Sequence, residues 1–120
     1  IAGEAVTVPR AAFTANGPLI GGRWSVIQAV YIDVAGSPVA ITAAATGVRS
    51  GTIGMMNLRI VSPSGAVLTQ RTATPTGAEE LHIVLFATSS EVGTYTLESS
   101  NSGGGRYMNQ VFLQCLGTKR

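Results

Sequence analysis

Short runs in which apolar and polar residues alternate are the feature of this chain that most limits its fold. The clearest run, Arg23–Val34, is rich in β-branched and aromatic residues and keeps a period of two. That period is typical of a β-strand, because successive side chains of a strand point to opposite faces. Similar runs predict further strands at Val39–Thr46, Ile53–Val61, Ala66–Gln70, Leu81–Thr88, Gly93–Ser99 and Arg106–Leu116, with a short edge strand at Val6–Val8.

Gly and Pro residues mark the connections between these runs. The turn Ala35-Gly36-Ser37-Pro38 predicts a hairpin between Arg23–Val34 and Val39–Thr46. Ser62-Pro63-Ser64-Gly65 fits a type I turn and predicts a second hairpin, between Ile53–Val61 and Ala66–Gln70. Gly47–Gly51 and Asn101–Gly105 are expected to be loops.

Eight strands in 120 residues, with no helical period and no linker, predict one all-β domain spanning residues 1–120. An antiparallel jelly roll and an immunoglobulin-like sandwich both explain the alternation. The Cys–Trp–Cys spacing of true immunoglobulin domains is absent, since the chain has a single cysteine.

The residues that could carry chemistry are few. A Ser-His-Asp system would depend on His82, the one histidine, which lies in an alternating strand and is expected to face solvent or a neighbouring subunit. One His, one Cys and one Asp do not provide a metal site, and the carboxylates fall in turns or on wet strand faces. We therefore expect a protein that is not an enzyme and that needs no metal or cofactor.

Charge and hydropathy exclude two further classes of partner. The net charge is only +2, and the eight basic residues are spread singly, so nucleic-acid binding is not expected. No apolar stretch reaches the roughly 18 residues of a membrane span, so membrane insertion is not expected. Cys115 lies among apolar residues and is expected to be a buried free thiol.

The last predicted strand has no simply wet face. Met108, Gln110, Phe112 and Gln114 share one face, where apolar groups mix with amides. Such a face fits a contact with another copy of the chain, where amides can bond across a symmetry axis, and it equally fits ordinary burial inside a sandwich. The sequence leaves both interpretations open.

The order of these segments resembles a known family. The resemblance is carried by the hairpin Tyr31–Thr46, the strand before Ser62-Pro63-Ser64-Gly65, the segments Glu79–Ile83 and Gly93–Glu98, and the ending Ser102–Arg120. It is a resemblance to trimeric jelly-roll domains of bacteriophage virion proteins, which are similar in fold to tumour necrosis factor. The resemblance favours the jelly roll and implies a homotrimer on the surface of a phage particle, at the tip of a tail fibre or head fibre.

What the resemblance implies about function is adhesion by loops displayed to a host receptor, with Arg49, Ser50, Asn101 and Ser102 as candidate contacts. The partners would then be other copies of the chain, other virion proteins, and a host-surface glycan or protein. A capsid-decoration role is the alternative within the virion, in which the loops and Ile1–Arg10 grip shell subunits. A carbohydrate-binding module is the alternative of another class. Its stacking platforms would be Trp24, Tyr31 and Tyr107.

Overall fold

The computed structural model describes residues 6–33, 38–51, 54–76 and 80–119, which form nine β-strands and no helix. The all-β prediction is confirmed, with one short strand more than the eight expected. No helix in the described ranges could cross a membrane. The strands are β1 (Val6–Thr14), β2 (Leu19–Ile20), β3 (Ser25–Ile32), β4 (Val39–Arg49), β5 (Met56–Val61), β6 (Val67–Ala73), β7 (Leu81–Ser89), β8 (Gly93–Asn101) and β9 (Arg106–Lys119).

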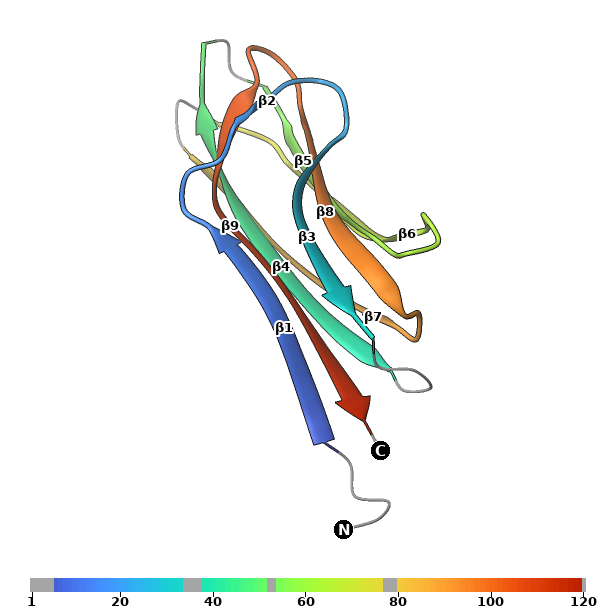
Figure 1. Cartoon of the computed structure of the whole chain (residues 1–120). Coiled ribbons are helices and arrows are strands. Elements are labelled where there is room, and N and C mark those ends of the chain that lie inside the picture. The colour runs from blue at the N-terminus through green and yellow to red at the C-terminus, as the bar shows by residue number, and fades with distance from the viewer. Residues whose placement is uncertain (1–5, 34–37, 52–53, 77–79, 120) are drawn as a thin grey trace.

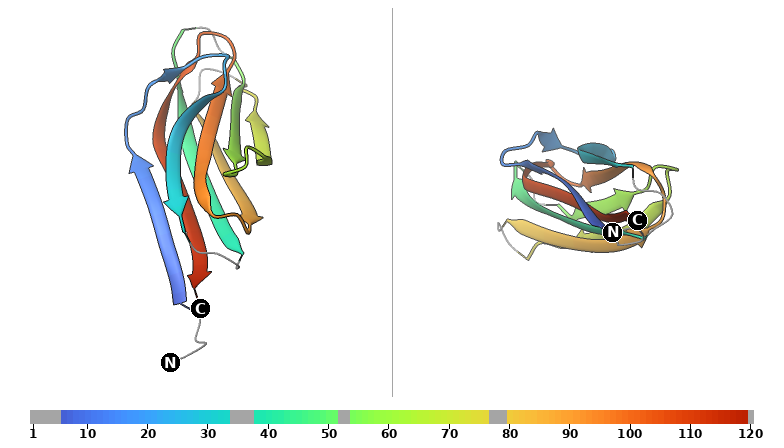
Figure 2. Two further views of the ribbon diagram at one scale, coloured as in Figure 1. Left: turned by 45° about the vertical axis from the view of Figure 1, so that its right-hand side comes forward. Right: turned by 60° about the horizontal axis from the view of Figure 1, so that its bottom comes forward.

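The strands form two antiparallel sheets that pack face to face (Figures 1 and 2). We call the first sheet A; its order is β1-β9-β4-β7, with β2 paired to one end of β9. We call the second sheet B; its order is β3-β8-β5-β6. Apart from β5 and β6, long strands that follow one another in the chain lie in different sheets. This crossing pattern is that of a jelly roll.

The hairpin predicted between Arg23–Val34 and Val39–Thr46 is wrong. β3 pairs with β8 in sheet B, whereas β4 pairs with β7 and β9 in sheet A, so the chain changes sheets between them. Residues 35–37 of the predicted turn Ala35-Gly36-Ser37-Pro38 lie outside the described residues. The second predicted hairpin is confirmed, because β5 pairs with β6 and the N–H of Gly65 donates to the carbonyl of Ser62 (2.9 Å), closing the turn.

The first strand is longer than the predicted Val6–Val8. All nine residues of β1 pair with β9, from Val6 opposite Lys119 to Thr14 opposite Val111. Pro9 is tolerated because β1 is an edge strand, where a missing N–H can face away from the ladder. The segment after Val8 was not recognised because proline, arginine and two alanines interrupt the alternating pattern.

The core fills the space between the sheets. Tyr95 and Leu97 of β8 point inward, as do Met56, Leu58 and Ile60 of β5, and all five side chains are buried. They meet Ile41 and Ala43 of β4 and Leu113 and Cys115 of β9 in one cluster. Alternate burial along each strand is what fixes its register, since a slip by one residue would turn every apolar group outward.

The molecule is elongated, measuring 57 × 24 × 21 Å. Four connections meet at one end, between β1 and β3, β4 and β5, β6 and β7, and β8 and β9, shown at the top of Figure 1. We call this the loop end. β1 begins and β9 ends at the opposite end (Figure 2).

Candidate binding surfaces

Two of the connections at the loop end are hydrogen-bonded to each other. The N–H of Met55 donates to Ser102 Oγ (2.8 Å) and the N–H of Ser102 donates to the carbonyl of Met55 (3.0 Å). The N–H of Ser50 reaches the carbonyl of Gly105 (3.4 Å). The structure therefore brings the predicted loop contacts Ser50 and Ser102 onto one surface, although 52 positions separate them in the chain.

The other two predicted loop contacts lie inside strands. Arg49 is the exposed last residue of β4, so the predicted loop Gly47–Gly51 begins three residues later than expected. Asn101 is the last residue of β8 and is fully buried, so its placement in an exposed loop is wrong. Its side-chain N–H group donates to the carbonyl of Ile20 (3.1 Å) and to Ser99 Oγ (3.2 Å), which explains why an amide is kept in the interior.

A buried cation holds the loop end from inside. The side chain of Arg106, at the start of β9, is 1% exposed. Its guanidinium donates to the carbonyl of Gly47 in β4 (3.1 Å) and to that of Gly54 in the connection between β4 and β5 (3.0 Å). Hydrogen bonds to a charged group contribute about 1.5–3 kcal/mol each. Sequence reasoning missed Arg106, because an arginine after three glycines looks like an ordinary surface charge.

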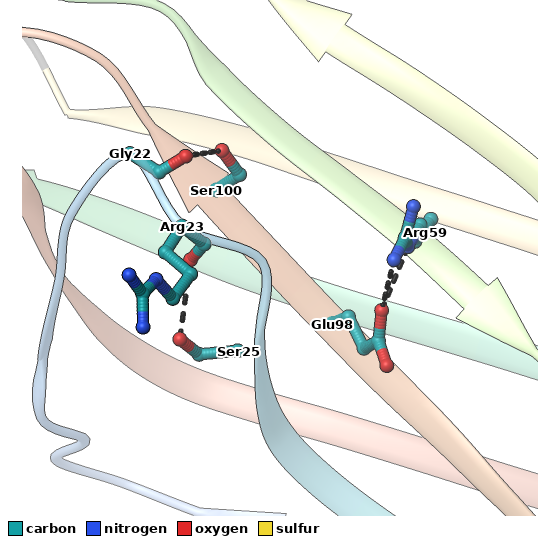
Figure 3. Close-up of polar contacts among 6 residues, drawn as sticks. All are labelled: Gly22, Arg23, Ser25, Arg59, Glu98 and Ser100. Atoms are coloured by element: carbon teal, nitrogen blue, oxygen red, sulfur yellow. Dashed lines mark hydrogen bonds and ion pairs between the residues drawn. The ribbon is translucent and has the colours of Figure 1, made fainter.

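The connection from β1 to β3 is also fixed to its neighbours. Two N–H groups of β9 donate to it: that of Gln110 to the carbonyl of Ala15 (3.0 Å), and that of Met108 to the carbonyl of Pro18 (3.2 Å). At its far side Ser100 Oγ donates to the carbonyl of Gly22 (2.9 Å), as Figure 3 shows. The loop end is thus tied to strands at several points.

The predicted aromatic contacts do not form one platform. The guanidinium carbon of Arg59 lies 4.0 Å from the ring centroid of half-buried Trp24, so one face of the indole is covered. Arg59 is held there by Glu98, whose carboxylate it meets at 2.6 Å (Figure 3). Tyr31 lies exposed on the outer face of sheet B, whereas Tyr107 points outward from sheet A, since both of its neighbours are buried.

A bulge in β9 changes which of its residues face outward. Between Asn109 and Phe112 β9 has one residue more than β4 opposite it, and Gln110 takes a left-handed φ of 50°. Met108 is therefore turned into the core, where it is fully buried, and its predicted position beside Phe112 is wrong. Gln110, Phe112 and Gln114 remain on the outer side, with Gln110 exposed and the other two half-buried.

The outer face of sheet A is broad and uncharged. The strand registers align its side chains in three rows of four, each running from β1 across β9 and β4 to β7. We call these residues the sheet-A face: Phe13, Phe112, Ala44 and Val84; Ala11, Gln114, Thr42 and Phe86; Pro9, Leu116, Ala40 and Thr88. None is Asp, Glu, Lys or Arg. Phe13 is 62% exposed, Phe86 71% and Val84 44%.

A small polar cluster borders the sheet-A face toward the loop end. Thr46 Oγ1 donates to Gln110 Oε1 (3.3 Å) and lies 2.9 Å from His82 Nδ1. These three side chains come from β4, β9 and β7. His82 is exposed and its partners are a hydroxyl and, through it, an amide, so the geometry assembles no nucleophile with a base and an orienting carboxylate.

The single cysteine is enclosed in the core. Burial raises the pKa of the Cys115 thiol to about 11, which keeps it in the neutral and unreactive form. Among the described residues, no three His, Cys, Asp or Glu side chains gather in a way that could hold a metal ion.

Strand order and sheet packing define the chain as a double-sheet jelly-roll sandwich. No protein-family model and no curated protein matches its sequence. Solved structures do match its fold. A chain of Bacillus endospore appendages, described as disulfide-linked pili, has a TM-score of 0.54 at 10% identity, covering 100% of this chain and 95% of the other.

The VP2 protein of infectious bursal disease virus matches as well. A mutant VP2 in virus-derived particles has a TM-score of 0.57 at 11% identity over 98% of this chain. VP2 from a subviral particle has a TM-score of 0.54 at 8% identity over 95%. The chain spans 32% and 37% of these VP2 chains, about a third of their length. The fold is thus shared with a virus-capsid protein and a pilus protein, and at these identities the likeness concerns the fold alone.

Proposed function

We propose that this chain is a non-enzymatic structural protein of a phage particle, a trimeric fibre-tip or adhesion domain that presents its loop end to a host receptor. The observation that carries the proposal is the construction of the loop end. Ser50 and Ser102 lie on a surface whose connections are bonded to each other, and Arg106 holds that surface from within. A surface fixed in this way binds without first paying the entropy of ordering its loops.

The fold neighbours support a role in assembly. Double-sheet jelly rolls form capsid domains, and the neighbours with solved structures belong to a capsid and to a pilus. The pili of that neighbour are described as disulfide-linked. This chain has a single cysteine, which is buried, so its copies would associate without disulfide bonds.

A repeating subunit of a shell or appendage is the second candidate function, and the coverage of the appendage match favours it. The match covers 100% of this chain and 95% of the appendage chain, so the shared fold accounts for nearly all of that appendage chain. The capsid-decoration alternative belongs with this candidate. Its proposed grip through Ile1–Arg10 rests partly on residues 1–5, which lie outside the described residues.

The adhesion role is tested by binding of the labelled chain to a panel of bacterial cells and to a glycan array. We expect Arg49→Glu to weaken cell binding by at least about 10-fold, as loss of one charged contact does. Arg10→Glu is the matched control, since it makes the same charge change on exposed β1, away from the loop end. Equal binding by both variants would contradict recognition through the loop end.

The location is tested separately by immunogold labelling of purified phage particles with an antibody against the chain. Label at fibre tips supports the adhesion role, whereas label spread over the shell supports decoration. Absence of label from every particle overturns the virion role.

A further inference from the structure

The connection between β1 and β3 contains the pair Asn16-Gly17, and Asn16 is the one asparagine of the chain that a glycine follows. Asn16 is exposed and lies just beyond the end of β1. Asparagine is a chemically labile residue, because the next main-chain nitrogen can attack its side-chain amide. A following glycine favours that attack, since it has no Cβ to crowd the nitrogen and leaves the backbone the most freedom to bend.

The reaction at such a pair needs only water as a co-reactant. The nitrogen of Gly17 gives up its proton and forms a bond to Asn16 Cγ. The bond from Cγ to Nδ2 breaks, and the amide nitrogen leaves with that proton as ammonia. Water then opens the cyclic imide at either of its two carbonyls. The products are aspartate at position 16 and the isomer in which the main chain runs through the side-chain carboxyl.

The fold keeps this labile pair because position 17 requires a glycine. A Cβ there would collide with the carbonyl oxygen of Met108. The connection is also fixed to β9 on either side of the pair, since the carbonyls of Ala15 (3.0 Å) and Pro18 (3.2 Å) accept N–H groups of that strand. Every other amino acid carries a Cβ, so Gly17 cannot be replaced without displacing the connection from β9.

The proton that the reaction must remove is held by a side chain of β9. The N–H of Gly17 donates to Oδ1 of Asn109 (3.2 Å), a half-buried residue of the bulged part of that strand. While this hydrogen bond is formed, base in the solvent cannot take the proton, and moving the nitrogen onto Asn16 Cγ would break the bond. The reaction must therefore wait until the connection opens locally, as hydrogen exchange of a protected N–H does.

We propose that Asn16-Gly17 is a site of spontaneous deamidation and that Asn109 is the residue that slows this reaction in the native chain. Asn109 is a positioning residue in this role, because its oxygen accepts the N–H whose proton must leave first. The inference is independent of the proposed function, since it concerns a reaction of the chain with water.

Deamidation would change the loop end in two ways. Either product adds a negative charge at position 16. The isomer also adds a methylene to the main chain between Ala15 and Pro18, whose carbonyls both accept N–H groups of β9. Those hydrogen bonds could not all be kept with a longer main chain, so the modified connection would be held less firmly.

The test follows the chain in mildly alkaline buffer by digestion and mass spectrometry, which detects the exchange of an amide for a carboxyl at each asparagine. In denaturing urea we expect position 16 to react fastest of the four asparagines. In the native chain the same position should react at least about 10-fold more slowly, because three hydrogen bonds to β9 hold the connection and each contributes about 2–10-fold.

Asn109→Ala removes the accepting oxygen and should raise the native rate at position 16 by about 3–10-fold, the effect of one net hydrogen bond. Asn57→Ala is the matched control, because Asn57 is another half-buried strand asparagine, which donates to the carbonyl of Ser100 (3.0 Å). It should leave that rate unchanged. Asn109→Asp keeps an accepting oxygen and should keep the slow rate, which separates loss of the hydrogen bond from a general loosening of the fold.

Equal rates at position 16 in urea and in the native chain would overturn the inference, as would a rate in urea no faster than at the other asparagines. An unchanged native rate in Asn109→Ala would overturn the role of Asn109. An equal increase in Asn57→Ala or in Asn109→Asp would overturn it too. A failure of the proposed function, seen as absence from phage particles, would leave each of these rates as it is.

Discussion

Arg106 and Cys115 are both enclosed in the sandwich, and different physical causes make their burial tolerable. Arg106 stays charged and compensates its lost hydration by donating to the carbonyls of Gly47 and Gly54. Cys115 stays neutral, because burial raises its thiol pKa to about 11. The first residue fixes a connection between strands, and the second fills core volume.

The stability of the chain should fall at alkaline pH in part through Cys115. The ordinary thiol value is 9.0 and the folded value is about 11, so folding favours the neutral form. This contribution is complete below pH 9 and is lost as the pH rises from 9 to 11. Its size is on the order of 2–3 kcal/mol, since one pKa unit corresponds to about 1.4 kcal/mol.

The measurement is urea unfolding at several pH values, compared with Cys115→Ala. The alanine variant lacks the thiol, so the difference in unfolding free energy between the two proteins should shrink from pH 8 to pH 11. A constant difference would contradict the buried thiol, as would rapid reaction of the native chain with a thiol reagent at pH 8.

At the scale of strands, the connection from β1 to β3 depends on close backbone approach. A Cβ on Gly17 would collide with the backbone carbonyl oxygen of Met108, which cannot rotate away. The N–H of Gly17 also donates to Asn109 Oδ1 (3.2 Å), which anchors this connection to the bulged part of β9.

We therefore expect Gly17→Ala to destabilise the fold by about 1–3 kcal/mol, the usual cost of overpacking. Gly21→Ala is the control in the same connection, because its Cβ would meet nothing within 4 Å. Thermal unfolding should show a lower melting temperature for Gly17→Ala and a change within about 0.5 kcal/mol for Gly21→Ala. Equal effects would show that the collision at Met108 is avoided by a shift of the connection.

Strand existence could be predicted from the sequence, whereas strand pairing could not. Alternation is a local property, and the burial of Leu58, Tyr95 and Leu97 follows it. Pairing depends on residues far away in the chain. The Gly and Pro residues after Arg23–Val34 would be the same whether the next strand paired with this one or lay in the other sheet. Met108 was misplaced because the extra residue of a bulge leaves no mark in the alternation around Gln110.

The candidate surfaces were predicted only in part, for the same reason. Phe112 and Gln114 were recognised from their own strand, but Phe13, Val84 and Phe86 join them only through the registers of β1, β4 and β7. Arg106 could not have been found, since its carbonyl partners lie 59 and 52 positions away.

For the whole molecule, β9 is the strand on which sheet A depends. It pairs with β1 along nine residues, with β4 along most of its length, and with β2 near its start. Among the described strands, β1 and β2 pair with β9 alone, so each loses that ladder if β9 is absent.

Truncation after Gly105 should therefore leave a chain that does not fold. We expect its far-ultraviolet circular dichroism to lack the β signal and its melting curve to lack a cooperative transition. Truncation after Gly117 is the control, because it removes only the pairs that Val6 and Thr7 make with Lys119 and Thr118. A cooperative transition in the shorter chain would show that sheet B folds on its own.

The position of β9 also sets the order of events during synthesis. The first and last strands of the described chain lie side by side, and the sheet-A face is made of rows that each cross both of them. While the ribosome still holds residues 106–119, no row is complete and the aromatic rings of β1 and β7 are not yet on one surface. The rows of the sheet-A face can thus form only after β9 has been synthesised and has paired with β1 and β4.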